Sequence, residues 1–193
     1  MSLKADSLCD RVIRAVMMEG MCFMIPKETI MLLSGIPATR KSSFGRYLAT
    51  EHRFAHYDIE CYPNSWPHPE LYKTFLNDRH AFVKRLREQH DRTVLDWGFP
   101  VRCLSWVDEL RTCGVRLIWF SGDIAHAREE FKKRGVGKGS EDNFNKQITA
   151  IQREGYPASL DCVIVPALSS SGVFLDQRQI ENIVFPPIMP AYV

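Results

Sequence analysis

Gly35, Lys41 and Ser42 stand at the spacing of a phosphate-binding loop. The pattern for such loops is G-x-x-x-x-G-K-[ST], and the sequence fits it except that Arg40 replaces the second glycine. An apolar segment that predicts a buried strand precedes the loop, and an amphipathic segment at 42–51 predicts a helix directly after it. This strand, loop and helix order is the context that the pattern requires.

The chemistry of phosphate binding explains these residue types. Backbone N–H groups of the loop and of the helix N-terminus point at a phosphate, whose charge the helix dipole favours. Lys41 is predicted to reach the β- and γ-phosphates as a catalytic cation, and the Ser42 hydroxyl to ligate Mg²⁺. We therefore expect ATP and Mg²⁺ to bind here. The nucleotide-binding residues are predicted to be Gly35, Ile36, Pro37, Ala38, Thr39, Arg40, Lys41, Ser42 and Ser43.

Arg40 leaves two interpretations of the loop open. The usual glycine lets bare backbone approach the phosphates, so an arginine can indicate a decayed site. It can equally indicate a loop whose side chain points outward and adds positive charge beside the nucleotide. A third alternative is a plain turn from strand to helix, capped by Ser42.

Two acids at predicted strand ends are candidates for the chemistry of transfer. Asp96 closes an apolar segment, and on a strand beside the loop strand it would hold Mg²⁺ directly or through water. Asp58 ends another strand that we expect beside the phosphate loop, with Glu60 close by, and is predicted to orient or deprotonate an acceptor hydroxyl. The alternatives are a strand-end turn for Asp96, and a helix cap or outer metal ligand for Asp58.

Basic residues are predicted to cover the phosphates from a helical lid at about 128–145. Arg128, Lys132 and Arg134 lie on or after a predicted helix, and a glycine-rich basic stretch, 135–140, follows. Phosphoryl transfer needs cations near the γ-phosphate and a cover that excludes water, which these residues would supply. The alternative is a solvated basic loop.

An irregular, proline-rich segment at 62–69 follows the second predicted strand. Ligands bind beyond the carboxyl ends of strands in open α/β sheets, so Tyr62 and Trp66 could face a substrate there. Packing residues that hold the connection are an equally good interpretation.

Strand and helix patterns alternate along the chain. Strands are predicted from residue 30 to the loop and at 54–59, 93–98, 115–120 and 161–166. Helices are predicted at 5–18, 42–51, 69–90, 101–112, 123–134, 140–154 and 176–184, the third as one long helix or a pair. This alternation predicts a five-stranded parallel sheet covered by helices on both faces, hence a three-layer α/β fold.

Composition limits the class of protein but not its partner. The 193 residues suit one domain with a lid, and 45% apolar with 25% charged residues is ordinary for a soluble globular protein. A net charge of +2 gives no basic field for nucleic acid, and no apolar run approaches the roughly 18 residues of a membrane span. The six cysteines show no C-x-x-C pair, so a reduced, cytoplasmic protein is expected.

The loop at 32–42, followed by Asp58, the run Val94 to Phe99 and a basic helix after Asp123, resembles the small P-loop kinases. That group includes zeta toxin, chloramphenicol phosphotransferase and the kinase domain of polynucleotide kinase. The run Val-Leu-Asp-Trp-Gly-Phe is also similar to one in bacterial ATPase-like members. The resemblance implies that the acid ending the second strand contacts the acceptor and that the basic lid helix covers the phosphates.

Three functions follow from these patterns. The first is an ATP-dependent kinase that acts on a small hydroxyl-bearing molecule. The second is a nucleotide-binding protein or pseudo-kinase whose turnover Arg40 has impaired. The third is a polynucleotide 5′-hydroxyl kinase, in which a basic surface tracks a phosphate backbone. That surface would be formed by Arg79, Lys84, Arg85 and Arg87.

Overall fold

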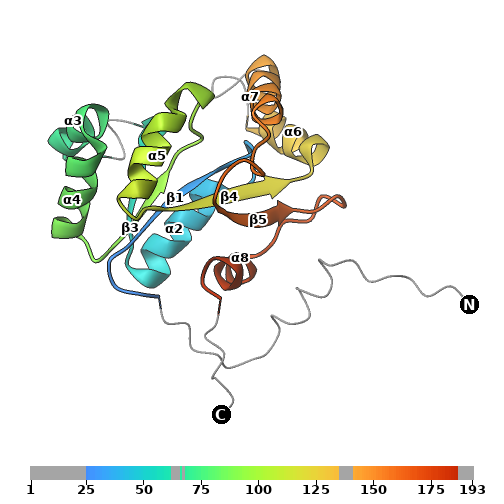
Figure 1. The fold of residues 1–193 in the computed structure, drawn as a ribbon. Helices are drawn as coiled ribbons and strands as arrows, with labels where there is room; N and C mark the ends of the chain where they lie inside the picture. The colour runs from blue at the N-terminus through green and yellow to red at the C-terminus, as the bar shows by residue number, and fades with distance from the viewer. Residues whose placement is uncertain (1–24, 62–65, 67, 135–140, 187–193) are drawn as a thin grey trace, which may run out of the picture.

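The computed structural model describes residues 25–61, 66, 68–134 and 141–186 (Figure 1). The helix predicted at 5–18 lies outside these ranges. Within them, five parallel strands form one sheet in the order β2-β3-β1-β4-β5. The strands are β1 (Thr29–Gly35), β2 (Ala55–Asp58), β3 (Arg92–Asp96), β4 (Arg116–Gly122) and β5 (Val163–Leu168). The predicted α/β fold with a five-stranded parallel sheet is therefore confirmed.

Helices connect the strands as the alternating patterns predict. The α-helices are α2 (Lys41–His52), α3 (Pro69–Asn77), α4 (Arg79–Gln89), α5 (Leu104–Thr112), α6 (Ile124–Lys133), α7 (Glu141–Arg153) and α8 (Gln177–Val184). Short 3-10 helices, η1 (Ile59–Cys61) and η2 (Val101–Cys103), follow β2 and precede α5.

The segment predicted as one long helix or a pair forms two helices. The chain breaks at Asp78, whose extended backbone ends α3 and whose side chain accepts the Ala81 N–H to cap α4. Asp123 caps α6 in the same way by accepting the N–H of His126. Local capping chemistry therefore sets these boundaries, as the sequence indicates.

Each face of the sheet carries its own layer of helices. Ile30 and Leu32 pack with α3, α4 and α5, whereas Met31 and Leu33 pack with α2 and α8 on the opposite face. Figure 1 shows these two groups of helices on either side of the sheet. Because successive side chains of a strand point to opposite faces, a continuous apolar strand requires both layers.

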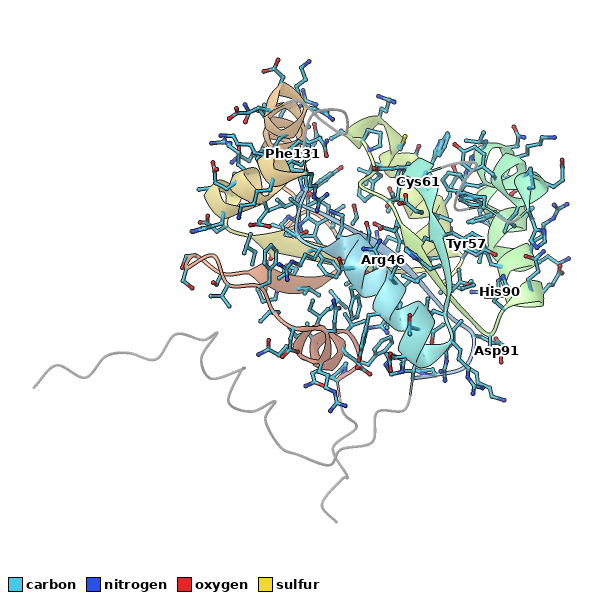
Figure 2. All side chains as sticks on the ribbon, turned by 180° about the vertical axis from the view of Figure 1, so that it is seen from behind. Arg46, Tyr57, Cys61, His90, Asp91 and Phe131 are labelled. Atoms are coloured by element: carbon cyan, nitrogen blue, oxygen red, sulfur yellow. The ribbon has the colours of Figure 1, made fainter. Side chains whose placement is uncertain are left out.

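A third apolar cluster lies beyond the carboxyl end of β1. Ile36 and Ala38 of the phosphate loop pack with Phe131 of α6 and with Phe144 and Ile148 of α7. Phe131 is labelled in Figure 2, on the side of the molecule away from Cys61. The helices predicted as a lid are thus anchored directly on the loop.

A hydrogen bond between a tyrosine and a histidine connects the edge strand β2 to α4. The Tyr57 hydroxyl lies 2.7 Å from Nε2 of His90, at the end of α4, and both residues are labelled in Figure 2. The Tyr57 ring also packs on the buried indole of Trp66. This contact fixes the strand that ends in Asp58.

No helix in the described part of the chain is long and apolar enough to cross a bilayer.

A buried carboxylate joins α2 to α8 at the end of α2 remote from the phosphate loop. Glu181 is 4% exposed; it accepts the Tyr47 hydroxyl at 2.6 Å, and Nε2 of His52 lies 3.0 Å from its other oxygen. Burial and this hydrogen bond raise the pKa of Tyr47, so its hydroxyl stays a donor. The cluster is therefore structural in our interpretation.

We expect Glu181→Ala to lower the free energy of unfolding by about 2 kcal/mol, because it leaves the partly buried polar groups of Tyr47 and His52 without their carboxylate partner. Urea denaturation followed by circular dichroism measures this loss. The control is Glu51→Ala on the exposed surface of α2, which should change stability little. Equal stability of the two variants would show that the buried contacts contribute nothing net.

Candidate phosphate-binding site

The phosphate loop begins where β1 approaches β4 more closely than a side chain allows. A Cβ atom on Gly35 would lie 2.1 Å from the carbonyl oxygen of Phe120, and Gly35 has φ 125°. The N–H of Ile36 donates to the same oxygen at 2.9 Å. Glycine is required here for steric reasons, which accounts for the first fixed position of the pattern.

Two further loop residues have left-handed backbone. Ala38 has φ 64° and Arg40 has φ 65°, a conformation that costs an L-residue about 1–2 kcal/mol. The glycine usual at the position of Arg40 avoids that cost. The Arg40 side chain is exposed, and its guanidinium carbon lies 3.7 Å from the centre of the Phe174 ring. It therefore lies over Phe174, as the outward-pointing interpretation requires.

The N-terminus of α2 has no side-chain cap. The helix begins at Lys41, Arg40 is its N-cap residue, and no side chain accepts a hydrogen bond there. The prediction of a plain turn capped by Ser42 is therefore wrong, because Ser42 lies inside the helix. First-turn N–H groups without a cap, at the positive end of the dipole, are suited to bind an anion.

Lys41 lies buried beneath the loop. It is 9% exposed, and its Nζ donates to the carbonyl of Ile36 at 2.9 Å and weakly to that of Gly35 at 3.4 Å. Burial lowers the pKa of Lys41 to about 8, although the carboxylates of Asp96 and Glu60 favour its charged form. A phosphate bound at this point would favour the charged form of the ammonium and raise its pKa again.

Ser42 and Asp96 form a pair that fits Mg²⁺. β3 lies beside β1, with Asp96 in register with Leu33, and Asp96 is 4% exposed. The Asp96 carboxylate accepts a hydrogen bond from Ser42, while its Oδ2 is buried without a hydrogen-bond partner. Burial raises the pKa of Asp96, and Ser42 and Lys41 oppose that rise. A hard cation would satisfy this orphaned oxygen.

No cluster of three His, Cys, Asp or Glu side chains that could hold a metal ion occurs among the residues described. Such a cage is not needed, since Mg²⁺ beside a nucleotide takes one or two protein oxygens and completes its shell with phosphate and water.

His56 is a neighbour of Asp96 that the sequence did not indicate. Its Nε2 lies 3.9 Å from Oδ2 of Asp96, and its ring occupies the space beside Gly45 of α2. Burial lowers the pKa of His56 despite the nearby carboxylates, so the ring is neutral near pH 7. The alternation of β2 placed this residue on the same face as α2, but only the strand order brought it to Asp96.

Asp58 does not end a strand beside the loop strand, as the sequence led us to expect. β2 pairs with β3, and β3 separates it from β1. The Asp58 carboxylate accepts the backbone N–H of Glu60 at 3.0 Å, and so shapes the turn η1.

Glu60 is the acid of this segment that lies beside the loop. Its carboxylate accepts the Gly98 N–H at 3.1 Å and interacts with the charge of Lys41. The protein around Glu60 excludes enough water to raise the pKa of its carboxyl, although Lys41 opposes this. The sequence placed Glu60 near Asp58, and the 3-10 turn turns it toward the centre of the sheet.

Glu60 and the loop share a cleft of about 430 Å³. Its polar walls carry Arg102 after β3 and Lys146 of α7, and its apolar wall carries Trp119 and Tyr156. Nε1 of Trp119 and the Tyr156 hydroxyl are buried without hydrogen-bond partners. The remaining lining residues are Ser34, Gly35, Gly98, Phe99, Pro100, Val101, Asn143, Gln147, Ala150 and Ile151.

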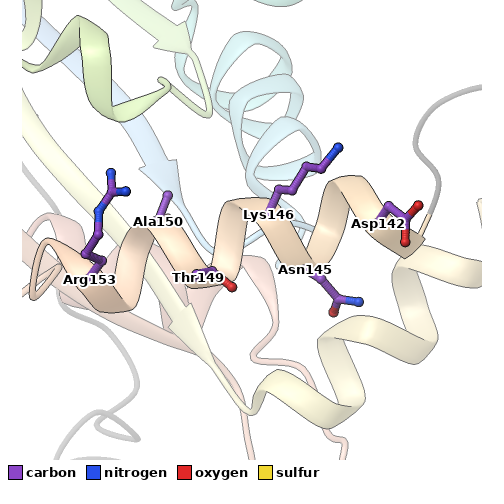
Figure 3. A pocket seen from close by; sticks show the side chains of 6 residues that line it. All are labelled: Asp142, Asn145, Lys146, Thr149, Ala150 and Arg153. Atoms are coloured by element: carbon purple, nitrogen blue, oxygen red, sulfur yellow. The ribbon is translucent and has the colours of Figure 1, made fainter.

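Figure 3 is a close view of another pocket along α7, which shares Lys146 and Ala150 with this cleft. Figure 3 shows Lys146 and Ala150 projecting from one side of α7 and Asn145 from the opposite side. A second, shallower hollow of about 360 Å³ follows α7 itself. It is lined by Asp142, Asn145, Lys146, Thr149, Ala150 and Arg153.

Solved structures share this architecture. No family model matches the sequence, and no curated protein is detectably similar to it. A sugar kinase from Janibacter sp. HTCC2649 superposes with a TM-score of 0.55 at 12% identity, covering 79% of this chain and 89% of that one. A gluconokinase from Sinorhizobium meliloti 1021 has a TM-score of 0.51 at 12% identity, covering 83% and 94%. The chain therefore shares the fold of these two kinases.

The three basic residues predicted to cover the phosphates, Arg134, Lys132 and Arg128, have different contacts in the structure. Arg134, which follows α6, interacts with the charge of Lys41. Lys132 is paired with Glu129 and Glu141, each at 3.3 Å.

Arg128 links α6 to α7. Its guanidinium donates to the Asn145 side chain at 3.3 Å and lies over the ring of Phe144. Only Arg134 is thus coupled to the loop, and the predicted lid connection at 135–140 lies outside the described residues.

Trp66 is a packing residue. It is 4% exposed, donates its indole N–H to the Asp58 carbonyl at 2.9 Å, and contacts the rings of Tyr72 and Phe75. The interpretation of Trp66 as a substrate-facing residue is therefore wrong. Tyr62 lies outside the described residues.

The basic surface named for a polynucleotide is engaged within the chain. Arg79 pairs with Glu109 at 2.7 Å, and Arg85 donates to the Thr74 hydroxyl. Arg87 donates to a backbone carbonyl, and Lys84 lies 4.0 Å from a glutamate on its own helix. These contacts use some of the donors of the four residues, while Lys84, Arg85 and Arg87 remain exposed, so the polynucleotide alternative stays a prediction.

We expect the affinity for ADP without metal to be level below about pH 8 and to fall as the pH rises further. In the free protein Lys41 loses its proton near that pH, whereas a bound phosphate favours the charged form, so binding at higher pH must take up a proton. The fall should approach tenfold per pH unit. Isothermal titration in buffers of different ionisation enthalpy measures both the affinity and the proton uptake.

The Lys41→Ala variant is the control for this titration, since weak binding and no slope are expected of it. A level affinity of the unaltered protein from pH 7 to about pH 10 would contradict the proposed contact between Lys41 and phosphate.

We expect Asp96→Asn to bind ATP without metal as well as the unaltered protein, but to lose the gain in affinity that Mg²⁺ provides. Asparagine fills the same space, yet removes the charge that attracts the cation. Titrations of ATP with and without Mg²⁺ measure the difference. Asp108→Asn, on the exposed surface of α5, is the matched control and should keep the full gain. If both variants respond equally to Mg²⁺, Asp96 is a structural strand-end residue only.

Proposed function

We propose that this protein is an ATP-dependent kinase that transfers the γ-phosphoryl group to a hydroxyl of a small molecule. The observation that carries the proposal is the shared cleft. Glu60, the phosphate-loop residue Gly35 and Lys146 line one cavity of about 430 Å³. That volume suits a small molecule, and it places an acid on the same cavity as the loop.

The phosphate end of this site is provided by the loop. The uncapped N–H groups of α2 and the Lys41 ammonium hold the β- and γ-phosphates, as predicted from the sequence. Ser42 and Asp96 would hold Mg²⁺, which supplies neutralisation of the phosphate charge when bound.

The acceptor end is assigned to Glu60 and not to Asp58. The acceptor oxygen attacks the γ-phosphorus, the bond from that phosphorus to the ADP oxygen breaks, and the hydroxyl proton passes to the Glu60 carboxylate. The raised pKa of the Glu60 carboxyl makes its carboxylate a better proton acceptor than an ordinary glutamate. Asp58 acts indirectly, because its hydrogen bond to the Glu60 N–H fixes the turn.

Arg134 is proposed to balance the charge of the transferred group, since it is the predicted lid cation coupled to Lys41. Lys132 and Arg128 keep supporting roles in joining α6 to α7.

The kind of acceptor follows from the fold and the cleft together. The two solved neighbours named above are a sugar kinase and a gluconokinase, so the fold carries transfer to small hydroxyl-bearing molecules in those proteins. Donors and acceptors in the cleft, among them Arg102 and Asn143, suit a polar molecule of this class. The similarity to these kinases is one of fold, and an assay with a panel of acceptors identifies the acceptor of this chain.

The test measures ATP affinity by titration and then phosphoryl transfer to a panel of sugars and hydroxy acids. We expect the unaltered protein to bind ATP with Mg²⁺ and to form ADP faster with one acceptor class. Glu60→Gln should lower turnover by about 10²-fold while leaving ATP affinity unchanged, because it removes the proton acceptor and not a phosphate contact.

Two further variants complete this experiment. Glu88→Gln on the exposed side of α4 should keep full activity. Asp58→Asn keeps a hydrogen-bond acceptor at the turn and should lower turnover less than Glu60→Gln. A larger loss in Asp58→Asn would return the acceptor role to Asp58. ATP binding without transfer to any acceptor would instead favour the pseudo-kinase.

A further inference from the structure

Arg40 and Phe174 form a stacked pair beside the phosphate loop, and neither residue lines the Glu60 cleft. The cleft is lined by residues of β1, β4 and α7 and by the segment after β3, whereas Phe174 follows β5, at the edge of the sheet. The phosphate to be transferred must point toward Glu60. The nucleoside attached to the other end of the phosphates must therefore point toward the β5 side.

We propose that the Arg40 guanidinium, held flat by Phe174, is the platform on which the base of the nucleotide stacks. This inference rests on the proposed function, because it concerns the nucleotide that the loop would bind. It gives Arg40 a role that the usual glycine cannot have. The ligand class is a purine or pyrimidine nucleotide, as opposed to a bare polyphosphate.

The geometry of the pair suits stacking. The guanidinium carbon lies 3.7 Å from the ring centre, which is the separation of two groups in face contact. The Arg40 side chain is exposed, so a ligand can reach it from solvent. A planar, delocalised cation accepts an aromatic base on its face, which a lysine ammonium cannot do.

The turn that carries Phe174 is held in place by backbone contacts. Phe174 forms an antiparallel bridge with Leu168 at the end of β5. Before it, the Gly172 N–H donates to the Ser169 carbonyl, and the Val173 N–H donates to the Ser169 hydroxyl. The ring is thus positioned independently of Arg40, and can orient the guanidinium.

Two features of the surroundings point to a ligand at this place. Val173, next to Phe174, is 63% exposed, an apolar surface beside the stack that a base would cover. Arg40 also keeps a left-handed backbone, where glycine would be unstrained. A residue that keeps an unfavourable conformation at a candidate binding loop indicates a use for its side chain.

The experiment compares ADP with inorganic pyrophosphate as ligands of the same loop. In Arg40→Lys the positive charge remains and the planar group is lost, so ADP affinity should fall about five- to tenfold while pyrophosphate affinity is unchanged. Phe174→Leu keeps an apolar side chain at the turn and should show the same selective loss. Circular dichroism establishes that both variants are folded, and Val173→Thr reports on the neighbouring apolar surface.

The outcomes separate the inference from the function on which it rests. If the unaltered protein binds neither ADP nor pyrophosphate, the phosphate loop assignment fails. If it binds both, and Arg40→Lys and Phe174→Leu leave ADP affinity unchanged or weaken both ligands equally, the stacking role is overturned and the kinase proposal stands. A selective loss of ADP in both variants supports the platform.

Discussion

The approach of β1 to β4 at Gly35 is the constraint on which the rest of the site depends. With no room for a Cβ beside the Phe120 carbonyl, the chain must leave the sheet at this point, and the Ile36 N–H takes up the same oxygen. The loop then turns through two further left-handed residues before α2 begins. Its helix N-terminus is aimed at the carboxyl edge of the sheet, where ligands of open α/β folds bind.

The charges around the loop are arranged for a ligand that is itself anionic. Lys41 and Asp96 are buried, and burial disfavours the charged form of both groups. The exposed residue Glu60 adds a second carboxylate to the electrostatic surroundings of Lys41. A buried charge is costly unless it is paired and hydrogen-bonded. A triphosphate with a divalent cation would answer both needs, since phosphate pairs with the ammonium and the metal with Asp96. The residues of the site thus fit a metal–nucleotide complex better than either alone.

Arg40 shows why a departure from the phosphate-loop pattern does not by itself mean that the loop cannot bind phosphate. Its substitution for glycine costs backbone strain, yet the exposed guanidinium lies over Phe174. The low identity to the solved kinases points the same way, because a shared fold conserves the position of a site more than its chemistry. The acidic, basic and aromatic residues that line the cleft must therefore be examined in this chain itself to find its substrate.

The sequence by itself determined the elements, the phosphate loop and the end of β3 at Asp96, because strands, caps and loop spacing are local patterns. It also placed the start of a helix at Asp123, which caps α6 in the structure, for the same reason. The tertiary structure decided which distant residues meet. Strand order placed β3 between β2 and the loop, which gave Glu60 the position predicted for Asp58 and brought His56 to Asp96. Neighbours across a sheet depend on the packing of the whole chain, so no local pattern contains them.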